Sequence, residues 1–453
     1  MPPRPTKRLL PATVLLLLGL LWLPAPAPAG VFDPETFTLD NGLQVVVVPN
    51  HRVPVVSHMM WYKVGSADEP KGKAGIAHFL EHLMFKGTAT RGPGEFSRII
   101  NRVGGSENAF TSYDYTAYYQ NVAKEQLGRM MALEADRMAN LKLAPADVES
   151  EREVILEERR SRTDNDPASQ FGEQVTAATY LAYPYRLPVI GWENEMRGLS
   201  HDDAVDFYRT WYAPNNAVLV VAGDVTTEEV RRLAAETYGV IPSRPVPDRA
   251  ALRGQEPPQL AARRLEMASP RVDQPSWSRR WLAPGVIWGD TTQAAPLEVL
   301  AEILGGGTTS RLYRALVVEA GIAVSAGAGY SPGGLGPQTF AVYASPRDGV
   351  EPAALEAAVE AEVTRLLRDG VTDEEVASAI IRMKRQAVFV RDDMLAPARL
   401  FGEAIVAGGG IADVEEWPER IAAVTAVRIA AAAKAVLVPE TSVTAVLRPK
   451  PAS

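Results

Sequence analysis

The sequence predicts an α+β protein made of two homologous halves, each an antiparallel-rich sheet covered by helices. The chain has 453 residues, which is too long for a single hydrophobic core. Short apolar runs of strand length alternate with segments of helical periodicity. The second half also repeats residues of the first at a shift of 220 positions. The matched residues are Trp61 with Trp281, Leu80 with Leu300, Gly87 with Gly307 and Thr88 with Thr308.

Residues 1–29 have the features of an export signal. Arg4, Lys7 and Arg8 form a basic start, residues 9–23 are apolar, and residues 27–29 read Ala-Pro-Ala, a cleavable pattern of small residues. The apolar stretch is short for a membrane span, so we expect cleavage, with retention as an inner-membrane anchor as the alternative. The expected location is the periplasm or the exterior, with membrane contact only if the signal is retained.

Composition narrows the class of protein further. Without the signal, 44 basic residues face 55 acidic ones, a net charge of −11 that does not favour nucleic acid as a partner. Cysteine is absent, which excludes disulfides, thiol catalysis and thiolate metal ligands. No further stretch of 18 apolar residues occurs, so we expect the mature protein to be soluble.

The elements of the first half follow from local patterns in order. Asp40-Asn41-Gly42 predicts a hairpin between strands at 32–39 and 42–49, and a third strand at 55–64 leads through a polar loop to a helix around 76–84. Residues 106–119 predict a strand, a turn and a strand. Helices are expected at 123–139, 146–160, 171–181, 200–212 and 226–238, and a strand at 216–222.

Domain boundaries are expected on either side of a proline-rich stretch. Residues 241–260 contain five prolines and no sustained apolar period, which is typical of a linker. We therefore predict a first domain at 30–240 and a second at 261–453. The strand at 216–225 has a counterpart at 441–449, so each half ends on an apolar strand.

The most informative motif is His78-Phe79-Leu80-Glu81-His82. Histidines four residues apart lie on one face of a helix, so both can reach a single metal ion, and Glu81 lies beside them. Two imidazoles plus an oxygen ligand, with one position open, hold a catalytic zinc. In the repeat, these positions become Glu298, Ala301 and Glu302, so the second half keeps the helix and loses the metal chemistry.

A third ligand is expected from an acidic helix farther along the chain. Five glutamates are candidates, and the spacing does not choose among them. They are Glu149, Glu151, Glu153, Glu157 and Glu158. A solvated charged helix is the usual meaning of such a run.

Here the sequence resembles the inverted zinc peptidases, the family of pitrilysin, the insulin-degrading enzyme and the mitochondrial processing peptidase. The matching segments are residues 38–43, 65–69, 78–82, 151–158 and 222–225, and the likeness extends over about residues 33–450. The resemblance implies a zinc-dependent endopeptidase that cleaves peptides or unfolded polypeptides, resembling the small bacterial zinc-bearing subunits.

By this resemblance His78, His82 and Glu158 bind zinc, Glu81 is the general base, and Glu151 orients the site. Residues 106–111 match the edge strand to which a peptide substrate adds, so Asn108, Ala109 and Phe110 are expected to contact substrate. An ordinary edge strand is the competing interpretation. The remaining histidines, at 51, 58 and 201, are interpreted as surface or strand-end residues.

The resemblance also reveals a missing pair of residues. Single-chain members carry an Arg and a Tyr in the second half, at positions that here match Val317 and Val324. Nearby Arg311 and Arg314 are out of register and are interpreted as helix-surface charges. We therefore expect a related partner subunit that supplies the pair, with a homodimer as an alternative. The competing functional class is a non-catalytic assembly or peptide-binding subunit of an envelope complex.

Overall fold

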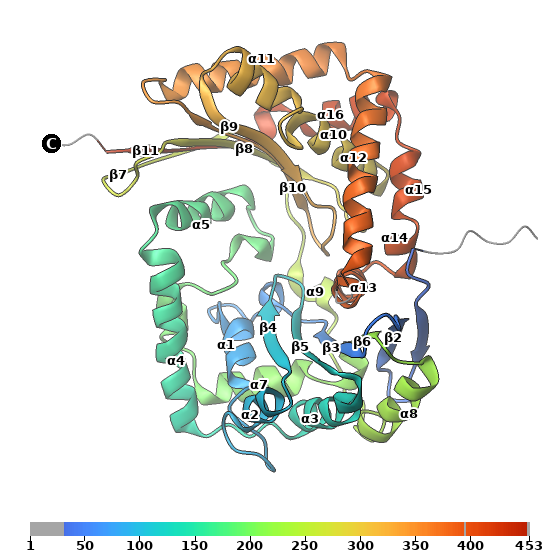
Figure 1. The fold of residues 1–453 in the computed structure, drawn as a ribbon. Helices are drawn as coiled ribbons and strands as arrows, with labels where there is room; N and C mark the ends of the chain where they lie inside the picture. Colours follow the sequence, from blue (N-terminus) through green and yellow to red (C-terminus); the bar gives the residue numbers. More distant parts are fainter. Residues whose placement is uncertain (1–30, 394–395, 451–453) are drawn as a thin grey trace, which may run out of the picture.

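A computed structural model describes residues 31–393 and 396–450, which form two α+β halves that face each other (Figure 1). The export signal predicted at 1–29 lies outside the described residues. Within the described ranges, the helices are all too short or too polar to cross a lipid bilayer.

The first half is built on a six-stranded sheet with the order β1-β2-β6-β3-β5-β4. Its strands are β1 Glu35–Thr38, β2 Gln44–Pro49, β3 Val55–Tyr62, β4 Ser106–Thr111, β5 Thr116–Ala123 and β6 Ala217–Gly223. Strands β2 and β6 run parallel, and every other neighbouring pair is antiparallel. Strand β4 hydrogen-bonds to β5 alone and is therefore an edge strand, as the sequence predicts.

Helices cover this sheet on the side that carries the large apolar core of the first half. The helices of the first half are α1 Ile76–Leu83, α2 Glu95–Arg102, α3 Leu127–Asn140, α4 Pro145–Arg159, α5 Pro167–Thr179, α6 Glu193–Met196, α7 His201–Trp211 and α8 Thr227–Thr237. Helix α5 is an exception, because its Phe171 and Val175 pack against residues 445 and 447 in the sheet of the second half. The pattern predicts most of these helices to within a few residues. The sequence analysis did not anticipate α2, which is largely polar and buries only Phe96 and Ile100.

The second half repeats the topology of the first. Its strands are β7 Arg263–Ser269, β8 Ser276–Ala283, β9 Ala323–Tyr330, β10 Gln338–Pro346 and β11 Ser442–Pro449. Their order is β7-β11-β8-β10-β9, with β7 and β11 parallel and the other pairs antiparallel. This is the order of β2-β6-β3-β5-β4 in the first sheet, strand for strand, so the fold is a duplicated α+β unit, as expected.

Some helices of the second half lie on the side of its sheet away from the first half, and the others run along one side of the molecule toward the first half (Figure 1). Their bounds are α10 Ala294–Gly305, α11 Pro352–Asp369, α12 Asp373–Asp392, α13 Ala396–Val406, α14 Ile411–Glu415, α15 Trp417–Ala422 and α16 Ala426–Val436. Helix α13 is different because it packs on the outer face of the first sheet, where a Cβ on Gly402 would come within 2.1 Å of the Trp61 ring. The halves are thus joined by packing as well as by the chain.

The proline-rich stretch expected to be a linker contains the short helix α9, Arg249–Arg253. Arg249 and Arg253 form ion pairs with the buried carboxylate of Asp68, and Arg253 also binds Asp114 in the turn between β4 and β5. The segment between the halves is therefore fastened to the first half by buried charges.

Candidate metal and catalytic site

Helix α1 presents the two motif histidines on one face. It begins after Gly75, whose φ of +96° and close approach to the carbonyl oxygen of Ile190 leave no room for a Cβ. The apolar residues of α1, Phe79 among them, point into the core and are at most 1% exposed. His78 and His82 occupy the opposite face, with ring centroids 4.7 Å apart.

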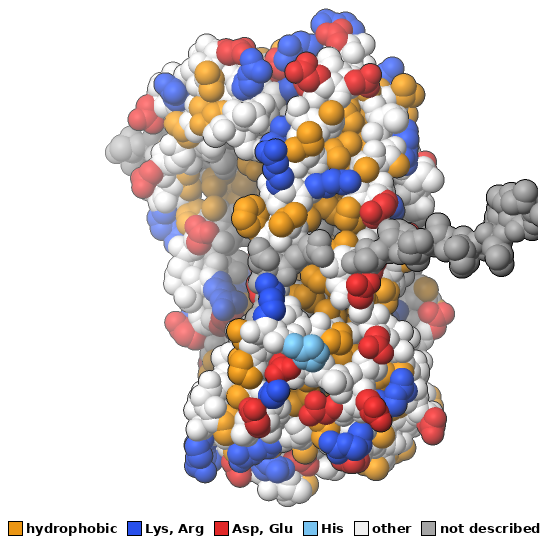
Figure 2. All heavy atoms as spheres, turned by 45° about the vertical axis from the view of Figure 1, so that its right-hand side comes forward, with side chains coloured by type: hydrophobic (Ala, Val, Ile, Leu, Met, Phe, Trp, Pro, Cys, Tyr) orange, Lys and Arg blue, Asp and Glu red, His pale blue; other side chains and the backbone are white. Residues whose placement is uncertain are grey.

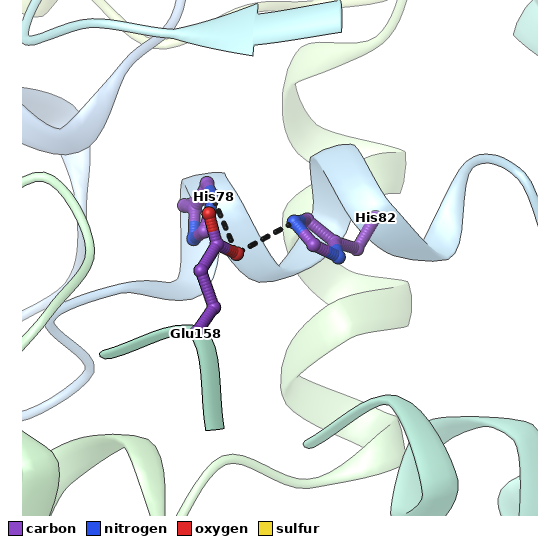
Figure 3. A group of neighbouring side chains, drawn as sticks. All are labelled: His78, His82 and Glu158. Atoms are coloured by element: carbon purple, nitrogen blue, oxygen red, sulfur yellow. Dashed lines mark ion pairs between the residues drawn. The ribbon is translucent and has the colours of Figure 1, made fainter. Parts of the chain in front are cut away.

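Glu158, near the end of α4, faces both histidines (Figure 3). Its Oε2 atom lies 3.3 Å from Nε2 of His82 and 3.7 Å from Nε2 of His78. One potential ligand atom from each of the three residues lies within 4.8 Å of the others. In a tetrahedral zinc site with bonds of about 2.0–2.1 Å, neighbouring donors are roughly 3.3–3.4 Å apart. The three side chains therefore have about the spacing of three zinc ligands that leave the fourth tetrahedral position open.

The polar environment also fits a cation. Oε2 of Glu158 is buried and has no hydrogen-bond donor among the described residues, which is costly for a carboxylate oxygen unless a cation satisfies it. Its other oxygen, Oε1, lies 2.7 Å from Arg162. Two neutral imidazoles and one carboxylate form the donor set of a catalytic zinc. Of the five candidate glutamates, Glu158 is the one that the structure brings to the histidines.

Glu151 supports the site from behind His82. Nδ1 of His82 donates to Oε1 of Glu151 at 2.9 Å, and Lys86 forms an ion pair with the other carboxylate oxygen. This bond leaves Nε2 of His82 facing Glu158. Without a metal ion, burial lowers the pKa of the His82 imidazole, but its contacts with Glu151 and Glu158 outweigh burial and raise the pKa to about 9. Zinc binding would therefore displace a proton from this ring and make it neutral. Burial and neighbouring His82 lower the pKa of His78 to about 4.

Glu81 is held by a residue to which the sequence analysis assigns no role. The hydroxyl group of Thr111, the last residue of β4, donates to Oε2 of Glu81 at 2.6 Å. Burial raises the pKa of Glu81, and the bond from Thr111 partly offsets this rise. A glutamate with a raised pKa is better suited to accept and return a proton near neutral pH. Thr111 lies inside the run that resembles the family strand, but spacing alone gives it no partner.

The predicted substrate residues lie on the open edge of β4. Asn108 is exposed, and its side-chain Oδ1 accepts a bond from the N–H of Ala109 at 2.9 Å. Phe110 points to the face of the sheet opposite to Ala109, where its ring packs edge-on against Trp61 at 5.4 Å. A peptide that pairs with this edge can replace the local bond at Ala109.

The counterpart positions in the second half hold no ligand set. Glu302 is paired with Arg382 at 2.7 Å, and Glu298 accepts a bond from the indole of Trp417 at 3.2 Å. Both glutamates line a cavity of about 1000 Å³ beside α10. Burial raises the pKa of Glu298 to about 7.

The structure also shows the surroundings of three residues outside the motif, Val317, Val324 and Arg311. Val317 and Val324 stand at the positions that match the Arg and Tyr of single-chain members, and neither side chain can donate a hydrogen bond. Arg311 is not a surface charge, because Glu375 pairs with it through contacts of 2.6 and 2.7 Å in a largely buried position.

His58 is likewise not a surface or strand-end residue. It lies within β3, is 0% exposed, and contacts Gln120 and Tyr238 through its two ring nitrogens. The alternation of the strand placed it in the core, where neighbouring polar side chains satisfy it.

A duplicated α+β scaffold whose first half carries H-x-x-E-H on a helix, with a later glutamate beside it, defines an inverted zincin. Residues 44–192 match the family model "Insulinase (Peptidase family M16)", and residues 198–383 match "Peptidase M16 inactive domain". The motif and both supporting glutamates fall within the first match. The chain belongs to the pitrilysin family of inverted zincins, peptidase family M16.

Two relatives and one solved structure align with this chain over most of their length. The chain is 31% identical to the zinc protease PqqE of Helicobacter pylori over 82% of this chain and 83% of that protein. It is 30% identical to the uncharacterized zinc protease SCO5738 of Streptomyces coelicolor, over 94% of this chain and 92% of that one. The crystal structure of a protease from Helicobacter pylori superimposes with a TM-score of 0.85 and 28% identity, covering 92% of this chain and 99% of the other. These likenesses support a peptidase.

Proposed function

We propose that this chain is a zinc-dependent endopeptidase that cleaves peptides or unfolded polypeptides. The observation that carries the proposal is the convergence of His78, His82 and Glu158 on one point, with Glu81 one helical turn away on the same face. These three side chains would hold the zinc ion. When bound, zinc supplies a Lewis acid that polarises the substrate carbonyl group and lowers the pKa of water.

Residues of this chain would transfer the proton, hold the metal ligands in place and align the substrate. Glu81 accepts a proton from the attacking water and later delivers it to the nitrogen of the departing amine. Thr111 holds Oε2 of Glu81, so the carboxylate keeps one orientation through both transfers. Glu151 holds the ring of His82 through Nδ1. The edge of β4 aligns the peptide as an additional strand, with Asn108 and Ala109 along its backbone.

We also propose that a related subunit completes the site with an Arg and a Tyr. Such donors stabilise the oxyanion that forms when water attacks the peptide carbonyl. Val317 and Val324 provide no donor at the matching positions, which supports a partner. The native protein, purified with whatever accompanies it, should then cleave peptides faster than the isolated chain. Equal activity of the isolated chain would remove the partner and leave the peptidase.

The central experiment compares zinc content and peptide cleavage in the wild type, in Glu81→Gln and in His82→Ala. Glu81→Gln should keep about one zinc per chain and lose cleavage by at least about 100-fold, because general acid–base catalysis contributes about 10²–10⁴-fold. His82→Ala should lose zinc and cleavage together. A wild type that binds peptides without cleaving them, even with its native partner, would instead favour the non-catalytic peptide-binding subunit.

Export of the chain remains part of the proposal. It rests on the basic and apolar pattern of residues 1–29 and on the small residues at 27–29. N-terminal sequencing of the native protein tests it, because processing should expose Gly30 as the first residue.

A further inference from the structure

The sheet of the second half turns one face toward the active-site half, and an arginine lies on that face. Neighbouring residues of β8 point to opposite sides of the sheet. Arg279 points toward the covering helices and pairs with Glu356 of α11 at 2.8 Å. Arg280 points the other way, with Nη1 at 3.4 Å from the hydroxyl oxygen of Thr176 on α5 of the first half.

Arg280 is only partly exposed, yet it lacks a counter-charge. Among the side chains that the structure describes, those of residues 31–390, 393 and 396–450, no carboxylate oxygen lies within 4.0 Å of its guanidinium group. In contrast, Arg249 and Arg253, which also lie near the junction, are both paired with Asp68. Withdrawing a cation from water without a partner costs free energy, so an unpaired, partly buried arginine needs an explanation.

The groups around Arg280 cannot supply that charge themselves. Burial lowers the pKa of Arg280, and the two residues that raise it again are the phenols of Tyr180 and Tyr113. Burial raises the pKa of both tyrosines, so they stay neutral at physiological pH. They provide a polar and aromatic wall beside the guanidinium group and leave its charge uncompensated.

The position of Arg280 connects it with the catalytic end of β4. Tyr113 lies in the turn two residues after Thr111, the residue that bonds Glu81. The ring of Tyr113 packs on Tyr185 at 4.7 Å, and Leu282, two residues after Arg280 on the same face, packs against this aromatic cluster. Arg280 therefore approaches the substrate strand from the opposite half, at the end where Glu81 lies.

Tyr343 extends the same face of the second sheet. Arg280 is paired with Ala341 of β10, and Tyr343, two residues further along, shares its side of the sheet. Tyr343 is 48% exposed, and its ring lies across β9, where a Cβ on Gly327 would come within 2.6 Å of the phenol oxygen. An exposed aromatic ring and an unpaired cation thus occupy neighbouring positions facing the first half.

We propose that Arg280 is a specificity-determining residue that binds a carboxylate group of the peptide substrate. The inference deepens the peptidase function proposed above and rests on it. A guanidinium group binds a carboxylate through two parallel hydrogen bonds, which restores the missing counter-charge. The carboxylate is either an acidic side chain near the scissile bond or the C-terminus of a short peptide.

The test uses peptides that differ in one carboxylate only. One pair places Glu or Gln within three residues of the cleaved bond, and the other carries a free or an amidated C-terminus. For each pair, kcat/KM is measured with the wild type and Kd with the Glu81→Gln protein, by fluorescence anisotropy of labelled peptide. The wild type should prefer the carboxylate-bearing member of one pair by about 10-fold, which corresponds to about 1.4 kcal/mol. The pair that shows the preference identifies the source of the carboxylate.

Arg280→Gln should bring the ratio of kcat/KM for the two members of that pair close to 1, and Arg280→Lys should restore part of the preference. The matched control is Arg264→Gln, which removes an arginine from β7 that pairs with Glu266 and Glu356. It should keep the full preference. Thermal unfolding of all variants checks that each is folded.

The outcomes separate this inference from the peptidase function. Cleavage of both members of each pair at equal rates, or a preference that survives Arg280→Gln, overturns the carboxylate site and leaves the peptidase intact. Binding that prefers the carboxylate and depends on Arg280, without cleavage by the wild type and its native partner, overturns the peptidase and supports the site.

Discussion

Thr111 donates a hydrogen bond from its hydroxyl group to Oε2 of Glu81 at 2.6 Å. The two residues have different proposed roles, because Thr111 ends the edge strand proposed to bind substrate and Glu81 is the proposed general base. The bond fixes the distance between the strand that would hold the peptide and the carboxylate that would move the proton. The alignment of the substrate and the transfer of the proton would therefore both depend on this hydrogen bond.

Replacing Thr111 with Val should lower kcat by about 10-fold or more, while zinc content stays the same. Valine keeps the shape of the side chain but removes the donor, and hydrogen bonds to charged groups are worth about 1.5–3 kcal/mol. Thr111→Ser keeps the hydroxyl group and should keep most of the activity. Kinetics on a labelled peptide, paired with metal analysis, makes the measurement. Unchanged kcat in Thr111→Val would show that Glu81 is positioned without this bond.

The two glutamates at 151 and 157 should respond very differently to substitution. Glu151→Gln should weaken zinc binding by about 10–100-fold, because residues that orient a metal-bound histidine have effects of this size. Glu157 is 70% exposed and pairs only with exposed Arg160, so Glu157→Gln should have no effect. Competition with a chromogenic chelator measures the affinities. Equal affinities in the two variants would mean that the bond from His82 to Glu151 does not support the metal.

Sequence reasoning recovered the residues whose spacing along one element encodes their geometry. His78, Glu81 and His82 could be placed together because helical periodicity is local. The choice of Glu158 over the other acidic residues of α4 could not be made from periodicity, since it depends on how α4 crosses α1 in space. Only the family resemblance selected it.

Contacts between residues far apart in the sequence could not be predicted for the same reason. The bond from Thr111 to Glu81 spans 30 positions, and the approach of Arg280 to Thr176 spans 104. Helix α2 was not predicted although Phe96, Ile99 and Ile100 form an apolar stripe, because the helix has only 8 residues and is otherwise polar. The duplication, in contrast, was visible because glycines and tryptophans at equivalent turns and strands keep their spacing.

Glu298, the counterpart of His78, should make stability depend on pH. Burial raises its folded-state pKa to about 7, above the ordinary value of 4.5 for an unfolded chain. Between these values the unfolded chain releases the proton and the folded chain keeps it, so stability falls as pH rises from 4.5 to about 7. Below pH 4.5 the residue contributes no pH dependence, and above pH 7 the loss is complete.

Glu298→Gln removes this ionisation, so the variant should lose less stability than the wild type between pH 5 and pH 8. The difference is at most a few kcal/mol, since each pKa unit corresponds to about 1.4 kcal/mol. Thermal unfolding of both proteins at the two pH values measures it. Parallel changes in the wild type and in Glu298→Gln would contradict the raised pKa.

Asp114 should contribute strongly to holding the two halves together, so its substitution should destabilise the protein. Its carboxylate accepts hydrogen bonds from the hydroxyl group of Tyr185 and, at 3.0 Å, from the N–H group of Leu335 in the second half. The same carboxylate forms an ion pair with Arg253. Asp114→Asn keeps the shape but leaves the buried arginine with less compensating charge. Losing one partner of a buried ion pair costs about 3–5 kcal/mol, whereas an exposed pair is worth about 0–1 kcal/mol.

The matched control for Asp114→Asn is Glu236→Gln, which breaks the exposed pair with Arg232 on α8. Urea unfolding should show a large loss of stability in Asp114→Asn and almost none in the control. Because Leu335 lies in the second half and Arg253 in the connecting segment, limited proteolysis should also cut residues 241–260 of Asp114→Asn faster than those of the wild type. If the two variants unfolded alike and were cut at the wild-type rate, the buried charges would not be what fastens the halves, and the packing of α13 on the first sheet would have to account for their union.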